Sequence, residues 1–319
     1  MNAPHVPVLL DEVLDALVLR DGALYVDGTF GAGGYSMAML ARAECRVIGI
    51  DRDPDVQTRA QGMDAVRDGR LTVLAGRFGD MDRLLAETGI SAVDGVALDL
   101  GVSSMQIDQA ERGFSFAKDG PLDMRMEQSG TGAADLVNSL PEEELSDIFW
   151  RYGEERHARR LARAIVADRK QTPFTTTGQL AGLIRRIVPR SNDGIDPATR
   201  AFQALRVAVN DEMGEIERGL RGAERLLSPG GRLAVVSFHS LEDRAVKTFL
   251  KNRSGTAPRP SRHLPLPEDG RAATFRLIAT RPIRPGRAEA DRNPRARSAR
   301  LRIAERTGAP AWNEEGAGL

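Results

Sequence analysis

Short apolar runs alternate with amphipathic stretches of helical length over the first hundred residues of the chain. The strand-like runs cover 23–26, 46–50, 71–74 and 93–98, and helical spacing covers 11–19, 36–41 and 80–87. Strands that alternate with helices along a chain favour a parallel sheet with helices on both faces. The pattern therefore predicts an α/β fold in which the carboxyl ends of the strands share one edge.

This alternation stops after residue 100 and returns after residue 200. The segment between contains amphipathic helical patterns without a good strand, and Ser139 to Glu142 has the form of a capping box that would open one helix. We expect an all-helical domain over 107–200, inserted into an α/β domain that comprises 1–106 and 201–319.

The last third of the chain resumes the α/β pattern. Apolar residues from Phe202 to Leu220 step at three and four, which predicts one long helix or two helices broken near Gly214 or Gly219. Strands are expected at 232–237, 274–280 and 299–305, with the last two as a candidate antiparallel pair.

A glycine-rich loop follows the first strand and includes Gly28, Gly31, Gly33 and Gly34. Glycines there let the backbone turn tightly and approach a ligand. Asp51 ends the second strand, where a carboxylate can accept both ribose hydroxyls of an adenosine cofactor. A structural turn beside a surface aspartate is the alternative, but the order of strand, loop, helix, strand and acid favours a cofactor site.

Two features favour S-adenosylmethionine over a nicotinamide cofactor. Asp27 ends the first strand just ahead of the glycines, where it can bind the amino group of a methionine moiety. A dinucleotide pyrophosphate would instead need helix-terminal N–H donors with no anion beside them. The Pro229-Gly230-Gly231 turn and the final antiparallel pair are also typical of class I methyltransferases. A dehydrogenase is therefore the less favoured alternative.

Composition narrows the class of protein further. Cys45 is the single cysteine, which excludes an internal disulfide and a multi-cysteine zinc site, and we assign no metal. The sequence has no apolar run of about eighteen residues, so we expect no membrane span. Met1 to Pro7 lacks the features of a signal peptide, and we expect a cytoplasmic protein.

The formal net charge of 0 conceals a basic block. Residues 244–306 contain 17 Lys and Arg against 5 Asp and Glu, a net charge of +12. Such a block suits a polyanion such as nucleic acid, because each neutralised phosphate releases counterions. Arg156, Arg159, Arg160 and Arg163 in the helical segment add to it. A solvated arginine-rich tail is the alternative.

Longer motifs follow the fourth strand. They include Asp99 to Ser104, Arg112 to Phe116, Tyr152 to Arg156, and Ser237 to Arg244. In these and other stretches, nearly the whole chain closely resembles the MraW family, also called RsmH. The resemblance implies a class I, Rossmann-like fold in which the helical insertion recognises the substrate. It implies methyl transfer from S-adenosylmethionine to the N4 amine of a cytidine in the decoding region of 16S rRNA, within the small ribosomal subunit. The oligomeric state stays open, a homodimer included.

The resemblance also assigns residues to the cofactor site. By motif the contacts are Gly33, Gly34, Tyr35, Asp51, Phe78, Asp99 and Gln106, and Asp27 joins them from its place at the strand end. The family usually has histidine where this chain has Tyr35. Without the family argument, Phe78 could be an ordinary core residue.

The chemistry needs an acceptor near the target amine. The N4 amine of cytosine is conjugated with its ring and is a poor nucleophile, so in-line placement is needed, and it can be worth on the order of 7–11 kcal/mol. Other amino methyltransferases follow this strand with a motif that contains two prolines, and this chain has Asp99 to Val102 instead. We place Asp99 at the junction of cofactor and base, with Ser103 and His239 as weaker candidates. Ser103 could instead cap a helix, and a lone histidine is more often structural.

Four aromatic residues have two interpretations. Phe114, Phe116, Trp150 and Tyr152 either stack on the target base and its neighbours or belong to the core, and the core is favoured. Two other function classes stay open from the residues alone. The intact cofactor motifs argue against a non-catalytic RNA-binding module, and the missing two-proline motif and the basic block argue against a methyltransferase of DNA or a small molecule.

Overall fold

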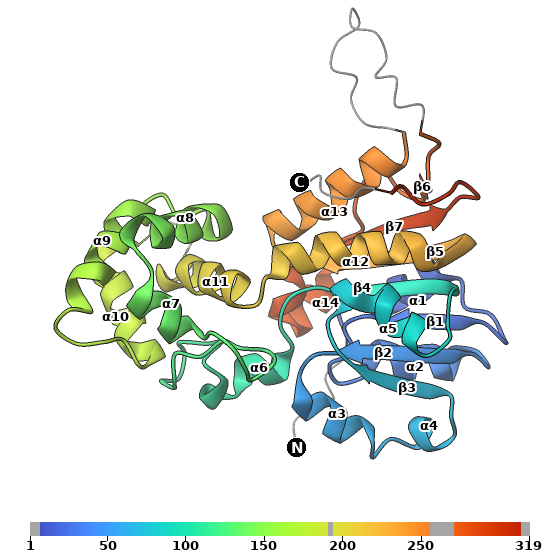
Figure 1. Cartoon of the computed structure of the whole chain (residues 1–319), viewed down its shortest axis with the longest axis horizontal. Coiled ribbons are helices and arrows are strands. Elements are labelled where there is room, and N and C mark those ends of the chain that lie inside the picture. The colour runs from blue at the N-terminus through green and yellow to red at the C-terminus, as the bar shows by residue number, and fades with distance from the viewer. Residues whose placement is uncertain (1–6, 191–193, 256–270, 314–319) are drawn as a thin grey trace, which may run out of the picture. The chain divides into compact units, whose positions relative to one another are not determined.

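The computed structural model describes residues 7–190, 194–255 and 271–313, and it contains two compact units (Figure 1). One unit comprises Met1–Gly101 with Met213–Leu319, and the other comprises Val102–Glu212. Residues 256–270 of the basic block lie outside the described residues. Among the described helices, none combines the length and the hydropathy that crossing a membrane requires.

The first unit is built on a seven-stranded sheet (Figure 1). Its strands are β1 Leu24–Asp27, β2 Arg46–Asp51, β3 Leu71–Ala75, β4 Val93–Asp99, β5 Leu227–Ser237, β6 Phe275–Leu277 and β7 Arg300–Arg306. The spatial order is β3-β2-β1-β4-β5-β7-β6, parallel from β3 to β5, with β7 antiparallel to β5 and β6. This is the strand order of class I methyltransferases, so the predicted fold class is confirmed, as is the pairing of the last two strands.

Helices cover both faces of this sheet because successive side chains of a strand point to opposite sides. Tyr25 of β1 belongs to a core cluster with α1, α2 and α3, whereas its neighbour Val26 belongs to another with α5, α12 and α13. The helices of this unit are α1 Leu10–Leu17, α2 Gly34–Arg42, α3 Pro54–Ala60, α4 Asp64–Arg67, α5 Met81–Glu87, α12 Glu212–Leu226, α13 Ser240–Arg253 and α14 Arg287–Arg292. The strands thus end between two packed layers.

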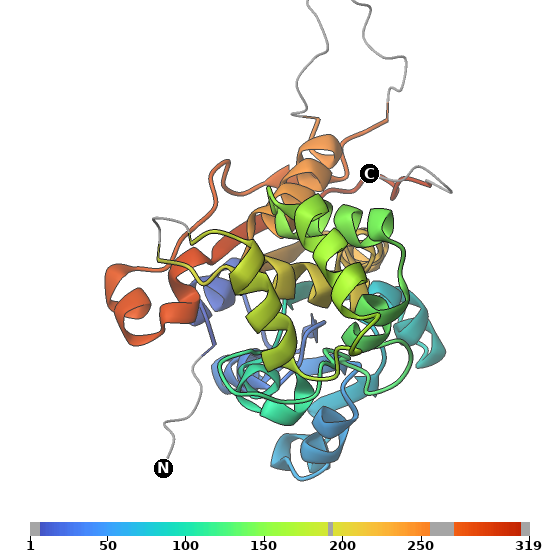
Figure 2. The same ribbon diagram turned by 90° about the vertical axis from the view of Figure 1, so that its left-hand side faces the viewer.

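The second unit consists of helices around one core of its own (Figure 2). They are α6 Ser104–Asp108, α7 Ala133–Ser139, α8 Glu142–Gly153, α9 Ala158–Asp168, α10 Thr177–Ile187 and α11 Ala198–Val209. This unit extends beyond the expected 107–200 at both ends. At the carboxyl end the reason is that α11 contributes Phe202 and Leu205 to the core.

The predicted capping box at Ser139 is wrong. Ser139 is the last residue of α7, and its Oγ donates to the carbonyl of Asp135 at 2.6 Å. The next helix begins at Glu142, with Pro141 before it and no side-chain cap. Pro141 is the N-cap residue, with an extended ψ of 157°, so it stands just outside the helix. Three glutamates in the first turn stabilise the helix start, because their negative charges interact with the positive end of the helix dipole.

The predicted helix over 202–220 is broken, but at neither of the expected glycines, Gly214 and Gly219. The break lies at Asn210 and Asp211, where Asp211 has a φ of 50°. The side chain of Asn210 donates to the carbonyl of Met124 at 2.8 Å. Because this partner lies 86 residues earlier, local periodicity could not locate the break.

Candidate functional site

The glycine loop connects β1 to α2 at the carboxyl edge of the sheet. Gly33 precedes α2 with a φ of 79°, a backbone conformation that glycine adopts at little cost. A Cβ at Gly34 would collide with the ring of Pro7. The first bond of the helix runs from Met37 N–H to the Gly33 carbonyl, and the N–H groups of Gly34 and Tyr35 donate to no described residue. These two amides are available to an acceptor on a ligand.

Asp27 ends β1 and is almost completely buried. Its Oδ2 accepts a hydrogen bond from Ser36 Oγ at 2.7 Å, and its Oδ1 accepts one from Thr29 N–H at 3.4 Å. Burial raises the pKa of Asp27 to about 6, and the charge of Asp51 adds to this shift, whereas the hydrogen bonds oppose it. A buried carboxylate with this pKa is stabilised by a cationic ligand.

Asp51 ends β2, the strand beside β1. Its Oδ2 accepts the N–H of Gly31 at 2.8 Å, and its Oδ1 accepts the N–H of Asp53 at 2.9 Å. The carboxylate therefore holds the glycine loop, and each oxygen keeps a second lone pair for hydroxyl donors. Burial raises the pKa of Asp51 above its ordinary value.

Asp99 ends β4 on the other side of β1. Its N–H donates to Thr29 Oγ1 at 2.6 Å, which joins the strand end to the glycine loop. Its Oδ1 is buried and accepts a hydrogen bond from no described residue. Burial, followed by the charges of Asp27 and Glu242, holds the pKa of Asp99 well above its ordinary range. A buried acceptor without a donor is costly, so this atom is suited to a ligand that brings one.

Asp27, Asp51 and Asp99 share one electrostatic property. No described residue forms an ion pair with any of them, although Arg52 weakly opposes the rise in the pKa of Asp51. Each lies at the carboxyl end of a neighbouring parallel strand, the edge at which open α/β sheets bind their ligands. This arrangement favours a ligand that carries positive charge and several hydrogen-bond donors.

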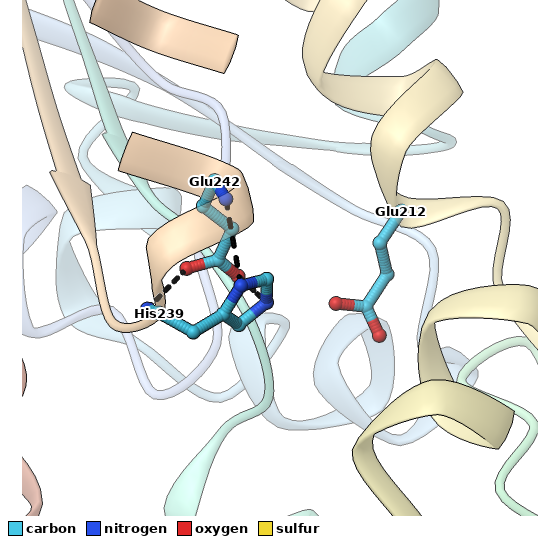
Figure 3. Close-up of side chains that lie close together, drawn as sticks. All are labelled: Glu212, His239 and Glu242. Carbon is cyan, nitrogen blue, oxygen red and sulfur yellow. Dashed lines mark hydrogen bonds and ion pairs between the residues drawn. The ribbon is translucent and has the colours of Figure 1, made fainter. Parts of the chain in front are cut away.

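His239 lies between β5 and α13, where it caps the helix. Its Nδ1 accepts the N–H of Glu242 at 3.4 Å, and Glu242 Oε2 accepts the N–H groups of His239 at 3.2 Å and Phe238 at 2.7 Å. The imidazole stands beside the Glu242 carboxylate (Figure 3), with Nε2 3.0 Å from Oε1 but without hydrogen-bond geometry. The structural role left open for His239 is thus present, and its catalytic role stays a prediction.

Ser103 and Gln106 belong to the second unit, where they form a capping box. Ser103 Oγ accepts the N–H of Gln106 at 3.3 Å, and Gln106 Oε1 accepts the N–H of Ser103 at 3.1 Å. This is the helix-capping alternative for Ser103. The predicted contact of Gln106 with the cofactor stays a prediction.

Tyr35 and Phe78 both use their rings in packing. Tyr35 is buried among Val8 and other core residues, and its hydroxyl donates to the carbonyl of Val8. A contact of Tyr35 with a ligand would therefore involve its free N–H, for which the family histidine is not required. Phe78 is half-buried beside β3 and packs against the backbone of Gly219 in α12.

The aromatic residues of the second unit separate into two groups. Phe114, Phe116 and Tyr152 contribute to its core, as the favoured interpretation states. Trp150 does not, because 60% of its surface is exposed.

The arginines of the basic block also form two groups, those paired with acids of the same unit and those exposed without a described partner. Arg300 and Arg302 both donate to Asp243, at 2.8 and 2.7 Å, and Arg253 is buried against Glu224. Arg297 is exposed and pairs with no described residue. Part of the charge that the sequence offers to nucleic acid is therefore neutralised inside the unit.

Sequence reasoning missed two residues that hold the candidate site. Ser36 supports Asp27, and no sequence signal marks it, because the contact requires that α2 pack back on β1. Glu242 carries a signal that could have been found. It stands three residues after His239, which is the spacing of a capping box before an apolar helix.

Comparison with known proteins gives consistent results. The sequence model of the MraW methylase family matches residues 2–307 of this chain. Ribosomal RNA small subunit methyltransferase H of Rhodospirillum centenum is 66% identical over 313 residues, which cover 98% of this chain and 95% of that protein. The protein of the same name from Paramagnetospirillum magneticum is 63% identical over 310 residues, and the shares covered are 97% and 98%. The one from Rhodospirillum rubrum is 60% identical over 318 residues, covering 98% of each chain.

Proposed function

Because the chain belongs to the MraW methylase family, we propose that it methylates the N4 amine of a cytidine in 16S rRNA of the small ribosomal subunit, with S-adenosylmethionine as methyl donor. The observation that carries this proposal is the similarity over nearly full length to proteins named ribosomal RNA small subunit methyltransferase H. The finer parts of the proposal concern the cofactor contacts, the acceptor of the amine proton and the cytidine target.

The residues at the strand ends fit S-adenosylmethionine. Asp27 would bind the ammonium group of its methionine part, and Asp51 would accept the two ribose hydroxyls. The free N–H groups of Gly34 and Tyr35 suit its carboxylate, and Gly33 gives the loop its turn. Phe78 would border the adenine, since it is only partly buried beside β3. When bound, S-adenosylmethionine supplies an electrophilic methyl group on a cationic sulfur.

Asp99 is the residue proposed to act on the target amine. Its buried Oδ1 accepts no hydrogen bond from a described residue, so it can accept one from the N4 amine as the nitrogen turns pyramidal. A positive charge nearby favours the ionised form of a carboxyl group. Beside a cationic cofactor, Asp99 would therefore have its raised pKa lowered, and its carboxylate would serve as a proton acceptor.

Methyl transfer to small ribosomal subunits from cells that lack this gene tests the proposal. With labelled S-adenosylmethionine, we expect label in 16S rRNA, recovered as N4-methylcytidine when the nucleosides are identified by mass. Label in another nucleoside would overturn the cytidine target. Binding of the cofactor without transfer to subunits, together with transfer to DNA or a small molecule, would overturn the RNA substrate.

A further inference from the structure

In the second unit, α8 and α9 lie side by side (Figure 1, Figure 2). Residues of both helices line a groove on the surface. Its volume is about 750 Å³, and its lining comes from residues 146–151 of α8, the turn after it and the first residues of α9. A volume of a few hundred cubic ångströms or more is typical of sites that hold a small molecule or part of a larger one.

The turn between the two helices is fixed by buried contacts. Glu155 is buried, and its carboxylate accepts the N–H of His157 at 2.8 Å. The N–H of Glu155 donates to the Phe149 carbonyl at 3.1 Å, and the N–H of Ala158 donates to the Glu155 carbonyl at 3.2 Å. The groove is therefore formed before any ligand arrives, which lowers the entropy that binding would cost.

The groove has a strongly positive lining. Four arginines contribute to it, and the carboxylate of Asp147, 3.4 Å from Arg151, is its only acidic group within the described residues. Arg156, Arg159 and Arg160 are exposed and pair with no described residue. Two of these cations stand in the first turn of α9, where acidic side chains are normally preferred. An anion in the groove would relieve this repulsion.

Trp150 gives the groove a flat apolar surface. It lies in α8 beside Arg151 and is 60% exposed, whereas the neighbouring Phe149 is completely buried. Among the large apolar side chains that are exposed in the described residues, it is the only aromatic one. An exposed indole next to unpaired arginines has the two components by which proteins hold single-stranded nucleic acid, a stacking surface for a base and cations for phosphates.

We propose that this groove binds a single-stranded segment of the RNA substrate, with one base stacked on Trp150 and the flanking phosphates on Arg156, Arg159 and Arg160. The proposal rests on the proposed function for its choice of RNA as the polyanion. Its geometry requires only the residues of α8, α9 and the turn between them. Stacking on an indole accepts any base, so the groove supplies affinity and leaves the choice of nucleotide to other residues.

Tryptophan fluorescence provides a direct test, because the chain has only two tryptophans. A short single-stranded RNA oligonucleotide is titrated into the full-length wild type and into the Trp150→Phe variant. We expect quenching in the wild type and loss of most of that quenching in the variant, which keeps an aromatic ring for stacking but loses the indole. RNA binding without quenching of Trp150 would overturn the proposal. Equal quenching by a polyglutamate peptide would also overturn it, since the groove would then recognise acidic chains in general.

Substitutions test the energetic contribution of each component. Trp150→Ala should weaken binding of the oligonucleotide about 5- to 100-fold, and Trp150→Phe should restore most of the affinity. Arg159→Ala with Arg160→Ala should reduce the salt dependence of log K by about 0.7 for each phosphate that the variant no longer neutralises. Arg186→Ala is the control, because Arg186 lies in α10 of the same unit, outside the groove, and pairs with Asp168 at 2.8 Å. An equal change in the control would overturn the assignment to the groove.

The small ribosomal subunit gives the second readout. Trp150→Ala should raise KM for subunits and leave both kcat and the affinity for S-adenosylmethionine within about twofold of wild type. Wild-type rates at all subunit concentrations would overturn the proposal. If the wild type binds the cofactor but methylates no subunits, the proposed function fails, and the fluorescence titration still decides whether the groove binds RNA.

Discussion

The carboxyl edge of the sheet and the groove between α8 and α9 have opposite charge imbalances. At the sheet edge, Asp27, Asp51 and Asp99 are without ion pairs to described residues, whereas in the groove three arginines are without them. Other charged side chains are paired within their unit, as Arg206 is with Glu212 at 2.7 Å. Charges left unmatched by the fold identify where a ligand of the opposite charge is expected. The formal net charge of 0 does not reveal that unpaired acids and unpaired arginines lie in different regions.

Removing the charge of Asp99 should have the largest effect. Asp99→Asn keeps the shape of the side chain but cannot accept a proton, so kcat for methyl transfer should fall about 100-fold or more. The affinity for S-adenosylmethionine should fall much less than kcat, because the variant keeps the proposed contacts of Asp27 and Asp51. Asp94→Asn is the matched control, since Asp94 lies at the other end of β4 and pairs with Arg20 at 2.7 Å. A kcat for Asp99→Asn within tenfold of wild type would contradict the assigned role.

Removing the carboxylate of Asp51 should weaken the binding of S-adenosylmethionine. Asp51→Ala deletes the proposed acceptor of two ribose hydroxyls, and hydrogen bonds to charged groups are worth about 1.5–3 kcal/mol each. The affinity for S-adenosylmethionine, measured by calorimetry, should fall at least about 100-fold. Asp55→Ala is the control: it removes an exposed acid from the first turn of α3 and should leave the affinity for S-adenosylmethionine unchanged. Unchanged affinity in Asp51→Ala would disprove the ribose contact.

The pKa of Asp27 predicts a pH dependence of cofactor binding. Its value of about 6 means that the carboxylate becomes protonated below that pH, while the ammonium group of the ligand stays charged. Affinity should therefore decrease about tenfold per pH unit below about 6 and stay level from there to about pH 7.5, where an α-ammonium group begins to lose its proton. Asp27→Asn should bind weakly at every pH and lose this inflection. An inflection that persists in the variant would assign the titration to another group.

The raised pKa of Asp27 also predicts a pH dependence of stability. Its direction is opposite to that of cofactor affinity, because stability decreases as the pH rises. A group whose pKa is raised on folding binds its proton more tightly in the folded state, so its contribution is favourable at low pH and is lost between the unfolded value of 3.8 and about 6. At pH 7 the buried charge costs up to about 3 kcal/mol. Asp27→Asn should therefore raise the Tm of the protein without ligand at pH 7. A lower Tm would mean that the bond from Ser36 outweighs the cost of burial.

The smallest effect is expected in the basic block, where it distinguishes two kinds of arginine. Arg297→Ala removes an exposed cation and should reduce the salt dependence of RNA binding by about one phosphate contact or less, without lowering Tm. Arg302→Ala should lower Tm, because Asp243 loses one of its two partners, and should leave the salt dependence unchanged. If Arg302→Ala instead reduced the salt dependence and left Tm unchanged, the result would show that the ion pairs with Asp243 open when RNA binds.

The sequence predicts the sheet and its edge well, and for a local reason. Each strand is a short apolar run followed by its functional residue, so Asp27, Asp51 and Asp99 can be placed at one edge once the strands are known to be parallel. Asp99 is also the acid that ends the fourth strand. Its lack of a hydrogen-bond donor, however, depends on everything packed around it, which no sequence pattern contains.

The features that escaped prediction depend on contacts between distant residues. The helix break at Asn210 follows from a bond to Met124, and the support of Asp27 follows from Ser36 on the next helix. Trp150 and Arg159 are each candidates in the sequence, for separate reasons. Only the turn held by Glu155 brings them to one groove, so the surface they form could not be inferred from either residue alone.

The unmatched acids at the sheet edge also bear on how the protein completes a catalytic cycle. If the donor binds there as proposed, transfer of its methyl group converts a cationic sulfur into a neutral thioether. The spent molecule, S-adenosylhomocysteine, then presents one positive charge fewer to Asp27, Asp51 and Asp99, and its attraction to them weakens. The same carboxylates that would recruit the fresh donor would thus favour its exchange after each round, because they would discriminate between the two molecules by charge.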